Sequence, residues 1–276
     1  MTQLQVLICT FGPDGIRRVA ECRHPQVDGV EYIVSWQLPE GNPDIPESLR
    51  RDDFSIFISH DRGLSRNRNH AFFHATAPLL LISDDDVEYS SEQLLAVIDA
   101  FAQNEDCDFI CFRYESDPCQ KQYPEATFSF SERPPKGYYV SSIEIALRGK
   151  ALSSNASGGK TSIAFNENFG IGATFGCGEE EILIHDMIRA GLKGRFIPLT
   201  ICRHDAPTTA AKENCGKEFI QTKGAMIGYL HPATWPLRML AHSLRQTGGL
   251  KRRLLYIRHW LSGFMKARRA GVYSGR

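Results

Sequence analysis

An apolar run at residues 79–83 ends in three consecutive carboxylates, Asp84, Asp85 and Asp86. A short apolar run of this kind indicates a buried strand, and ligands of open α/β sheets bind where such strands end. Adjacent ionised carboxylates repel one another unless a cation or several hydrogen-bond donors neutralise them. Because hard oxygen ligands suit Mg²⁺ and Mn²⁺, the run predicts a divalent-metal site, with a solvated turn before a helix as the alternative.

The rest of the chain alternates between strand-like and helix-like segments. Strands are predicted at residues 3–10, 31–36, 55–59, 79–83, 108–114, 137–148, 163–165 and 194–201, and helices at 16–22, 64–75, 91–103 and 179–190. Ser90 and Gln93 have the spacing of a capping box at the start of the third helix. Residues 115–136 have no regular pattern. This alternation predicts an α/β fold with a mainly parallel sheet flanked by helices.

Length and cysteine usage limit the class of protein. With 276 residues, 42% of them apolar, the chain is long enough for one large domain and an appendage, and we expect a main domain at 1–220 and a basic helical extension at 221–276. The eight cysteines form no Cys-x-x-Cys pair, which favours reduced thiols and a cytoplasmic location. The apolar run at 4–9 is too short for a signal peptide or a membrane span, and it predicts the first core strand.

The formal net charge of zero conceals a strong asymmetry. Residues 219–276 contain eleven Lys or Arg and no acid, whereas residues 1–218 contain twenty-one Lys or Arg and thirty-two Asp or Glu. Within the basic segment, apolar residues from Leu250 to Met265 recur at helical spacing. Such a basic amphipathic helix is suited to the inner face of an anionic membrane. The alternative is a terminal helix that packs on the core with a solvated basic face.

A second acidic cluster, Glu179, Glu180 and Glu181, follows a glycine-rich approach. Glutamates in the first turn of a helix complement its dipole, so helix chemistry alone explains them. A carboxylate held beside a glycine-rich loop can also serve as a general base. His204 follows the strand predicted at 194–201, where a structural role and a role as metal ligand are both open.

Taken in order, these segments resemble a family 2 glycosyltransferase of the GT-A fold. The resemblance rests on Cys9-Thr10-Phe11 at the first strand end, residues 63–69 with Arg68, the acidic strand end 83–86, Gly178-Glu179-Glu180, and His204. It covers residues 1–205. It implies an inverting enzyme that uses a nucleotide-diphosphate sugar, with Mn²⁺ or Mg²⁺ bridging the diphosphate.

The resemblance also implies roles for individual residues. Thr10, Phe11, Arg68, Asp84 and Asp85 match positions that hold the donor nucleotide. Asp86 or its neighbours Asp84 and Asp85 match the metal-binding element, and the register of the triplet stays open. His204 matches a histidine that approaches the metal or the diphosphate in relatives.

The resemblance places the catalytic base at the second acidic cluster, where Glu180 matches the family position and Glu179 is the alternative. Direct displacement at an anomeric carbon needs such a base for the acceptor and charge neutralisation for the departing diphosphate. The expected activity is transfer from a UDP-sugar to a saccharide or lipid-linked acceptor in surface polysaccharide or lipopolysaccharide assembly.

The sequence departs from the family pattern after the second strand. Where relatives carry an acid that reads the nucleobase, this chain has Ser35, Trp36 and Gln37. Trp36 is expected to stack on the base or to lie in the core. Residues 115–165, where the acceptor would bind, carry no family signature.

Two other classes of function compete with the transferase. A nucleotidyl or phosphoryl transferase would also use clustered aspartates, but Gly158-Gly159-Lys160-Thr161 lacks the first glycine of a phosphate-binding loop. A non-enzymatic nucleic-acid binder could use the basic tail, yet that tail has few aromatic residues for base stacking, so no nucleic acid is expected as a partner.

Overall fold

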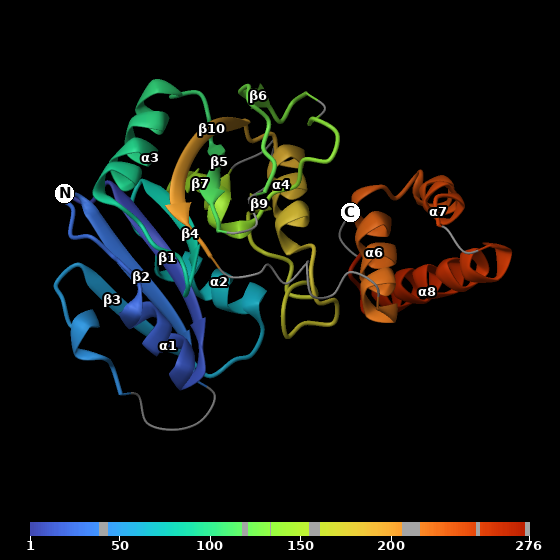
Figure 1. Ribbon diagram of the computed structural model, residues 1–276, viewed down its shortest axis with the longest axis horizontal. Coiled ribbons are helices and arrows are strands. Elements are labelled where there is room, and N and C mark those ends of the chain that lie inside the picture. Colours follow the sequence, from blue (N-terminus) through green and yellow to red (C-terminus); the bar gives the residue numbers. More distant parts are fainter. Residues whose placement is uncertain are drawn as a thin grey trace. The chain divides into compact units, whose positions relative to one another are not determined.

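The computed structural model describes residues 1–38, 44–117, 121–132, 134–154, 161–205, 216–246 and 249–273. The chain forms two compact units (Figure 1). The first contains residues 1–62, 66–165 and 186–206, and the second contains residues 63–65, 166–185 and 207–276. Gly158, Gly159 and Lys160 lie outside the described residues. A domain boundary at residue 220 stays a prediction.

The first unit is built on an eight-stranded sheet with the order β3-β2-β1-β4-β7-β5-β10-β6. Its strands are β1 (Leu4–Phe11), β2 (Val30–Gln37), β3 (Phe54–Ser59), β4 (Leu79–Asp84), β5 (Phe109–Glu115), β6 (Phe128–Ser129), β7 (Ile145–Arg148) and β10 (Gly194–Arg203). Strands β7 and β6 pair antiparallel with their neighbours, and the other pairs are parallel. The expected α/β architecture with a mainly parallel sheet is therefore confirmed.

Helices cover both faces of this sheet. Helices α1 (Gly12–Glu21) and α3 (Ser91–Gln103) pack their apolar residues on the face of β1 that carries Val6 and Ile8. On the opposite face lies α2 (Leu64–His74), where Asn67 accepts a hydrogen bond from Ser35 of β2. Because side chains alternate along a strand, the two sets of helices bury alternate residues of the same strands.

Local sequence signals explain several element boundaries. The capping box of α3 is confirmed: Ser90 Oγ accepts from the Gln93 amide at 3.2 Å, and Gln93 Oε1 accepts from the Ser90 amide at 2.8 Å. Helix α1 begins at Gly12, earlier than the predicted residue 16, because Pro13 stands in its first turn, where proline is tolerated and its fixed φ suits the helix.

Two predicted strands differ from the structure. The strand expected at 137–148 is limited to β7, because Ser141 and Glu144 form a capping box around a 3-10 turn at Ser142–Glu144 that interrupts extended backbone. The segment 163–165 is not a strand. The neighbouring two-residue strands β8 (Ser153–Ser154) and β9 (Thr161–Ser162) form a separate antiparallel pair instead.

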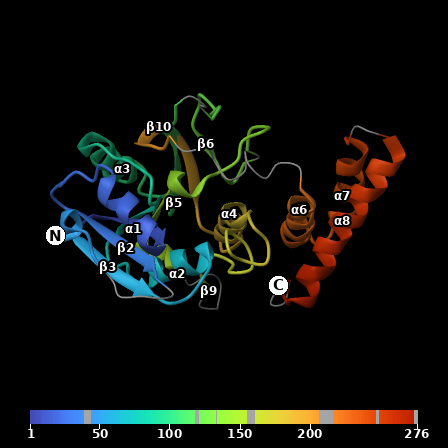
Figure 2. The ribbon, with the colours of Figure 1, turned by 60° about the horizontal axis from the view of Figure 1, so that its bottom comes forward.

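The second unit contains the basic C-terminal helices α6 (Lys217–Leu230), α7 (Trp235–Leu244) and α8 (Gly249–Arg269), together with most of α4 (Glu179–Arg189) (Figures 1 and 2). Helices α6 and α8 approach closely through glycines: a Cβ atom on Gly224 would lie 2.1 Å from the Trp260 carbonyl oxygen, and one on Gly263 would lie 1.9 Å from that of Gln221. Trp260 is completely buried. The basic helical tail is therefore a packed bundle rather than one isolated helix.

The apolar pattern of the tail divides between two surfaces. Tyr256 and Trp260 of α8 are buried in the bundle, whereas Leu250 and Leu254 are 73% and 56% exposed. The expected amphipathic helix thus uses its aromatic residues for internal packing and leaves leucines in solvent. Among the described residues, no helix has the length and apolar character required to cross a bilayer.

Candidate active site

The three aspartates at the end of β4 point to three different sets of partners. Asp84 is the last residue of the strand, and Asp85 and Asp86 follow in the turn. Asp84 contacts Arg68, Asp85 contacts Thr10 and Arg18, and Asp86 contacts His204. Each carboxylate has a donor of its own, which explains how three adjacent acids are accommodated at the edge of the sheet.

The first pair joins α2 to the sheet. Nη2 of Arg68 donates to Oδ1 of Asp84 at 3.1 Å and to Oγ of Ser142 at 2.7 Å, and Ser142 Oγ donates to the other oxygen of Asp84 at 3.2 Å. The side chain of Arg68 is 2% exposed, and its guanidinium lies 5.1 Å from the centre of the Phe165 ring. Arg68 is therefore placed to position Asp84.

Asp85 is held by α1 and β1. Thr10 Oγ1 donates to its Oδ2 at 2.6 Å, and Arg18 binds both oxygens, with Nε at 3.0 Å and Nη2 at 2.8 Å. Burial raises the pKa of Asp85, although these hydrogen bonds oppose the shift. Gly15 makes room for this cluster, since a Cβ there would lie 2.1 Å from Thr10 Oγ1.

Sequence reasoning did not identify Arg18. It lies in the last turn of α1. A basic residue in the helix that directly follows the first strand was the sequence feature that could have indicated it. A bidentate arginine fixes both the position and the orientation of a carboxylate. The side chain of Arg18 is also 48% exposed, so it combines this contact with access to solvent.

Asp86 is paired with His204, which follows β10. Oδ1 of Asp86 lies 3.2 Å from Nε2 of His204. An antiparallel bridge between Glu88 and Arg203, with both backbone hydrogen bonds at 3.0 Å, brings the two segments together. The hydrogen bond with Asp86 raises the pKa of His204. Burial alone would raise the pKa of Asp86, but the hydrogen bond and charge of His204 outweigh it and lower that pKa.

The donors at this position fit a divalent cation in part. Within the described residues, no group of three or more His, Cys, Asp or Glu side chains is arranged to hold a metal ion. Asp86 and His204 nevertheless supply an oxygen and a nitrogen ligand, and Nδ1 of His204 is buried without a hydrogen-bond partner. Mg²⁺ and Mn²⁺ are commonly bound by one or two protein ligands that substrate phosphates and water complete. The pair is compatible with that kind of site.

A cavity is lined by residues of α1 and of the end of β2, whereas Thr10 and Phe11 at the end of β1 are not part of its lining. Phe11, the last residue of β1, is half exposed. Trp36 is buried, donates from Nε1 to the Gly12 carbonyl oxygen at 2.8 Å, and lines a cavity of about 290 Å³ together with Pro13 and Leu38. Trp36 therefore belongs to the core and also forms one wall of the cavity.

The second acidic cluster opens α4 in the second unit. Glu179 is 4% exposed, Glu180 is half buried, and Glu181 is exposed. Gly170 has φ +103°, and a Cβ there would lie 2.9 Å from Ser65 Oγ and 3.2 Å from Cδ of Glu179. The glycine is therefore required both by its backbone conformation and by the close approach of Glu179.

Glu179 and Glu180 differ in environment. Both stand in the first turn of α4, at the positive end of the helix dipole. Glu179 and Ser65 both pack against Gly170, and Ser65 Oγ donates to the Phe169 carbonyl oxygen at 2.6 Å. Glu180 has the greater access to solvent, as a base that receives a proton from an incoming acceptor requires.

Comparison with known proteins identifies the class of fold. Residues 42–170 match the model of the family Glycosyl transferase family 2. No curated protein matches the sequence significantly. The structure of S. aureus TarS 1-349 in complex with UDP-GlcNAc is similar to this chain with a TM-score of 0.59 at 14% identity, covering 99% of this chain and 84% of TarS 1-349.

Two further solved structures are similar. A second structure, of S. aureus TarS, matches with a TM-score of 0.58 at 14% identity, and the match covers 99% of this chain and 50% of that TarS chain. The mannosyltransferase PcManGT from Pyrobaculum calidifontis in complex with GDP-Man and Mn²⁺ matches with a TM-score of 0.51 at 12% identity, covering 99% of this chain and 76% of PcManGT. Residues 42–170 therefore match glycosyl transferase family 2, and the chain has a GT-A-like fold.

Proposed function

We propose that this protein is an inverting, metal-dependent glycosyltransferase. It transfers a hexose from a nucleotide-diphosphate donor, with a UDP-sugar favoured, to a saccharide or lipid-linked acceptor in surface polysaccharide or lipopolysaccharide assembly. The observation that carries the proposal is the Asp86–His204 pair at the edge of the sheet in a family 2 domain.

Asp84 and Asp85 hold the donor in this proposal. Thr10 and Arg18 fix Asp85, which would contact the ribose, and Arg68 fixes Asp84. Asp86 and His204 would hold the divalent cation, which supplies charge neutralisation to the departing diphosphate when it is bound. The nucleobase occupies the cavity beside Trp36, where an aromatic wall suits a flat ring.

Glu180 acts as the general base, with Glu179 as the alternative. Its carboxylate removes the proton from the acceptor hydroxyl as that oxygen attacks the anomeric carbon on the side opposite the diphosphate. A single displacement of this kind inverts the configuration at that carbon. It requires one base, in contrast to glycoside hydrolysis, in which two carboxylates flank the bond and water attacks.

The donor class is supported by the solved relatives. TarS was solved with UDP-GlcNAc and with UDP, and PcManGT was solved with GDP-Man and Mn²⁺. Ser35, Trp36 and Gln37 stand where an acidic base-reading residue was expected, and all three are buried. We infer that the base is recognised in the cavity beside Trp36, whose lining also includes the exposed carboxylate of Asp44.

The helical tail places the enzyme on the inner face of an anionic membrane. Its exposed leucines include Leu240 and Leu244 of α7 and Leu250 and Leu254 of α8. Lys251 and Arg258 are exposed on α8, and residues 219–276 contain no acid. Exposed apolar residues among basic ones are the combination required for interfacial binding.

A thermal-shift panel tests the proposed activity. The protein is melted with UDP, GDP, CDP and dTDP, each with and without Mn²⁺, because a ligand that binds only the folded state raises the melting temperature. We expect stabilisation by one nucleotide, UDP, only when Mn²⁺ is present. The absence of any response to all four nucleotides would contradict the proposal.

A further inference from the structure

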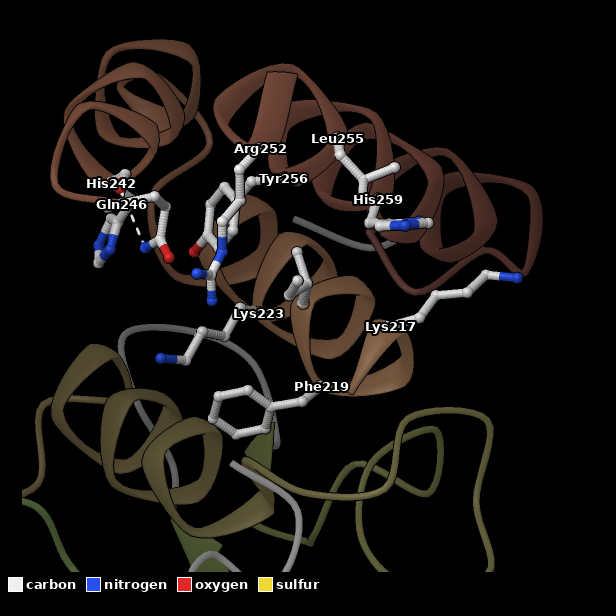
Figure 3. A pocket seen from close by; sticks show the side chains of 10 residues that line it. Lys217, Phe219, Lys223, His242, Gln246, Arg252, Leu255, Tyr256 and His259 are labelled. Atoms are coloured by element: carbon white, nitrogen blue, oxygen red, sulfur yellow. Dashed lines mark hydrogen bonds between the residues drawn. The ribbon is translucent and has the colours of Figure 1, made fainter. Parts of the chain in front are cut away.

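The second unit contains a cavity that the proposed donor site does not use. Its volume is about 350 Å³, and it lies among α6, α7 and α8 (Figure 3). Lys223 of α6 and Arg252 of α8 are part of its lining, and His242 and Gln246 contribute from α7 and the turn after it. Residues from three helices thus surround one space.

The lining of the cavity is cationic. It includes Lys217, Lys223 and Arg252 and contains no aspartate or glutamate. Across the described residues, no carboxylate lies within ion-pair distance of Lys223 or Arg252. The charge of Lys223 also interacts with the carboxylate of Glu181, which is exposed on α4 and does not line the cavity. Positive charges that converge on a cavity whose lining contains no acid favour the binding of an anion.

The histidine in the wall, His242, lies in the same positive potential. Burial lowers the pKa of His242, and the charges of Lys223, Arg245 and Arg238 lower it further. The imidazole is therefore kept neutral at physiological pH, because additional positive charge is unfavourable here. A neutral imidazole can still donate one hydrogen bond to an anion.

The shape and the remaining donors favour a phosphate. Figure 3 shows the guanidinium of Arg252 near the side-chain amide of Gln246, with the Lys223 side chain below them in this view. Gln246 donates from Nε2 to the His242 carbonyl oxygen at 3.3 Å, which fixes its amide. Arginine presents paired donors that match phosphate oxygens, and lysine adds a point charge.

We propose that this cavity binds a phosphate or diphosphate group, and that the group belongs to the sugar acceptor. The binding itself stands on the cavity alone, and only its assignment to the acceptor rests on the proposed function. Two sources share this chemistry: a lipid-borne phosphate and a soluble phosphorylated saccharide. The half-exposed Leu255 in the lining offers an apolar contact to the lipid-borne form.

Titration with inorganic pyrophosphate in the absence of divalent metal tests the cavity directly, since the proposed donor site needs a metal to bind a diphosphate. The full chain is compared with a Lys223→Gln/Arg252→Gln variant and with a control, Arg268→Gln/Arg269→Gln, that removes the same charge from an exposed part of α8. Removal of two charge-assisted contacts is expected to weaken binding about tenfold or more. The control is expected to bind like the unmodified chain.

Vesicles distinguish the two sources. Co-sedimentation is measured with pure phosphatidylcholine and with a mixture of phosphatidylcholine and phosphatidic acid. If the cavity variant loses the preference for phosphatidic acid and the control keeps it, the phosphate is lipid-borne. If only pyrophosphate binding depends on the cavity, the acceptor is a soluble phosphorylated saccharide.

The proposal is overturned if the unmodified chain does not bind pyrophosphate, or if both variants are weakened equally. Stabilisation by UDP with Mn²⁺ is measured on the same three proteins and is expected to be unchanged. If pyrophosphate binding depends on the cavity while UDP with Mn²⁺ has no effect on any of them, the cavity stands as a phosphate site and the transferase assignment fails.

Discussion

His204 Nε2 lies 3.2 Å from Asp86 Oδ1, and this contact joins the turn after β4 to the end of β10. Each partner stabilises the charged form of the other: the pKa of His204 is raised and the pKa of Asp86 is lowered. The pair therefore brings together two of the three residues, Asp86, Asp84 and His204, that the sequence proposed as ligands of one cation. Its neighbours Asp84 and Asp85 accept hydrogen bonds from Arg68 and Arg18, respectively.

Replacement of Asp86 by Asn is expected to abolish Mn²⁺-dependent binding of UDP, because the amide keeps the size of the side chain and removes the anionic ligand. The thermal shift given by UDP with Mn²⁺ measures it. Asp14→Asn, at an exposed aspartate of α1, is the control and should retain the shift. An Asp86→Asn protein that kept the full shift would remove Asp86 from the metal site.

Replacement of Glu180 by Gln should leave donor binding unchanged and lower the transfer rate by a factor of about 10²–10⁴, which is typical of the loss of a general base. Release of UDP from UDP-sugars in the presence of a bacterial membrane extract measures the rate, and the thermal shift measures donor binding. Glu179→Gln is made in parallel. If Glu179→Gln is the inactive variant and Glu180→Gln is not, the base is Glu179.

Replacement of Arg68 by Met is expected to reduce the free energy of unfolding by roughly 2–3 kcal/mol. The change leaves Asp84 without its buried cation, and the usual cost is lessened because Asp84 is one-third exposed. Urea denaturation measures the change. Arg17→Met removes an exposed pair with Asp14 and should cost less than about 0.5 kcal/mol. An Arg68→Met protein with unchanged stability would contradict this role of the Arg68–Asp84 pair.

His24 should make the protein sensitive to acid. It is buried, and its Nε2 atom lies 3.0 Å from the Val19 carbonyl oxygen. Burial, assisted by Arg51, lowers its pKa from 6.5 to about 4. The unfolded chain therefore binds more protons between these two values, so stability falls as the pH decreases from 6.5 to about 4, by about 3 kcal/mol in total. In urea titrations across this range, His24→Gln should show a weaker dependence on pH, and an unchanged dependence would contradict the shift.

A Leu250→Gln/Leu254→Gln variant should bind anionic vesicles at least about tenfold more weakly than the unmodified chain, because both leucines are exposed and available for insertion. Its melting temperature should not change, since surface substitutions rarely alter stability. Leu95→Gln, at a half-exposed leucine of α3, is the matched control. Equal vesicle binding by all three proteins would remove the membrane from the proposal.

Much of the fold followed from local chemistry. Alternating apolar runs and helical patterns predicted the mainly parallel sheet, and Ser90 and Gln93 fixed the start of α3. The strand expected at 137–148 was wrong over most of its length, because the turn at Ser142–Glu144 is stabilised by a capping box around Glu144. That carboxylate is buried against Lys121 and Tyr123, which lie in a segment without a regular pattern.

The candidate site divides in the same way. The sequence by itself determined that three carboxylates stand where a buried strand ends, because a short apolar run indicates a buried strand and the three acids follow it directly. Only the tertiary structure decided that these carboxylates have separate partners, Arg68, Arg18 and His204. The spacing of residues along the sequence determines local geometry such as strand ends and helix caps. Which residue of another element becomes a side chain's partner depends on how strands and helices pack, and that packing is a property of the whole chain.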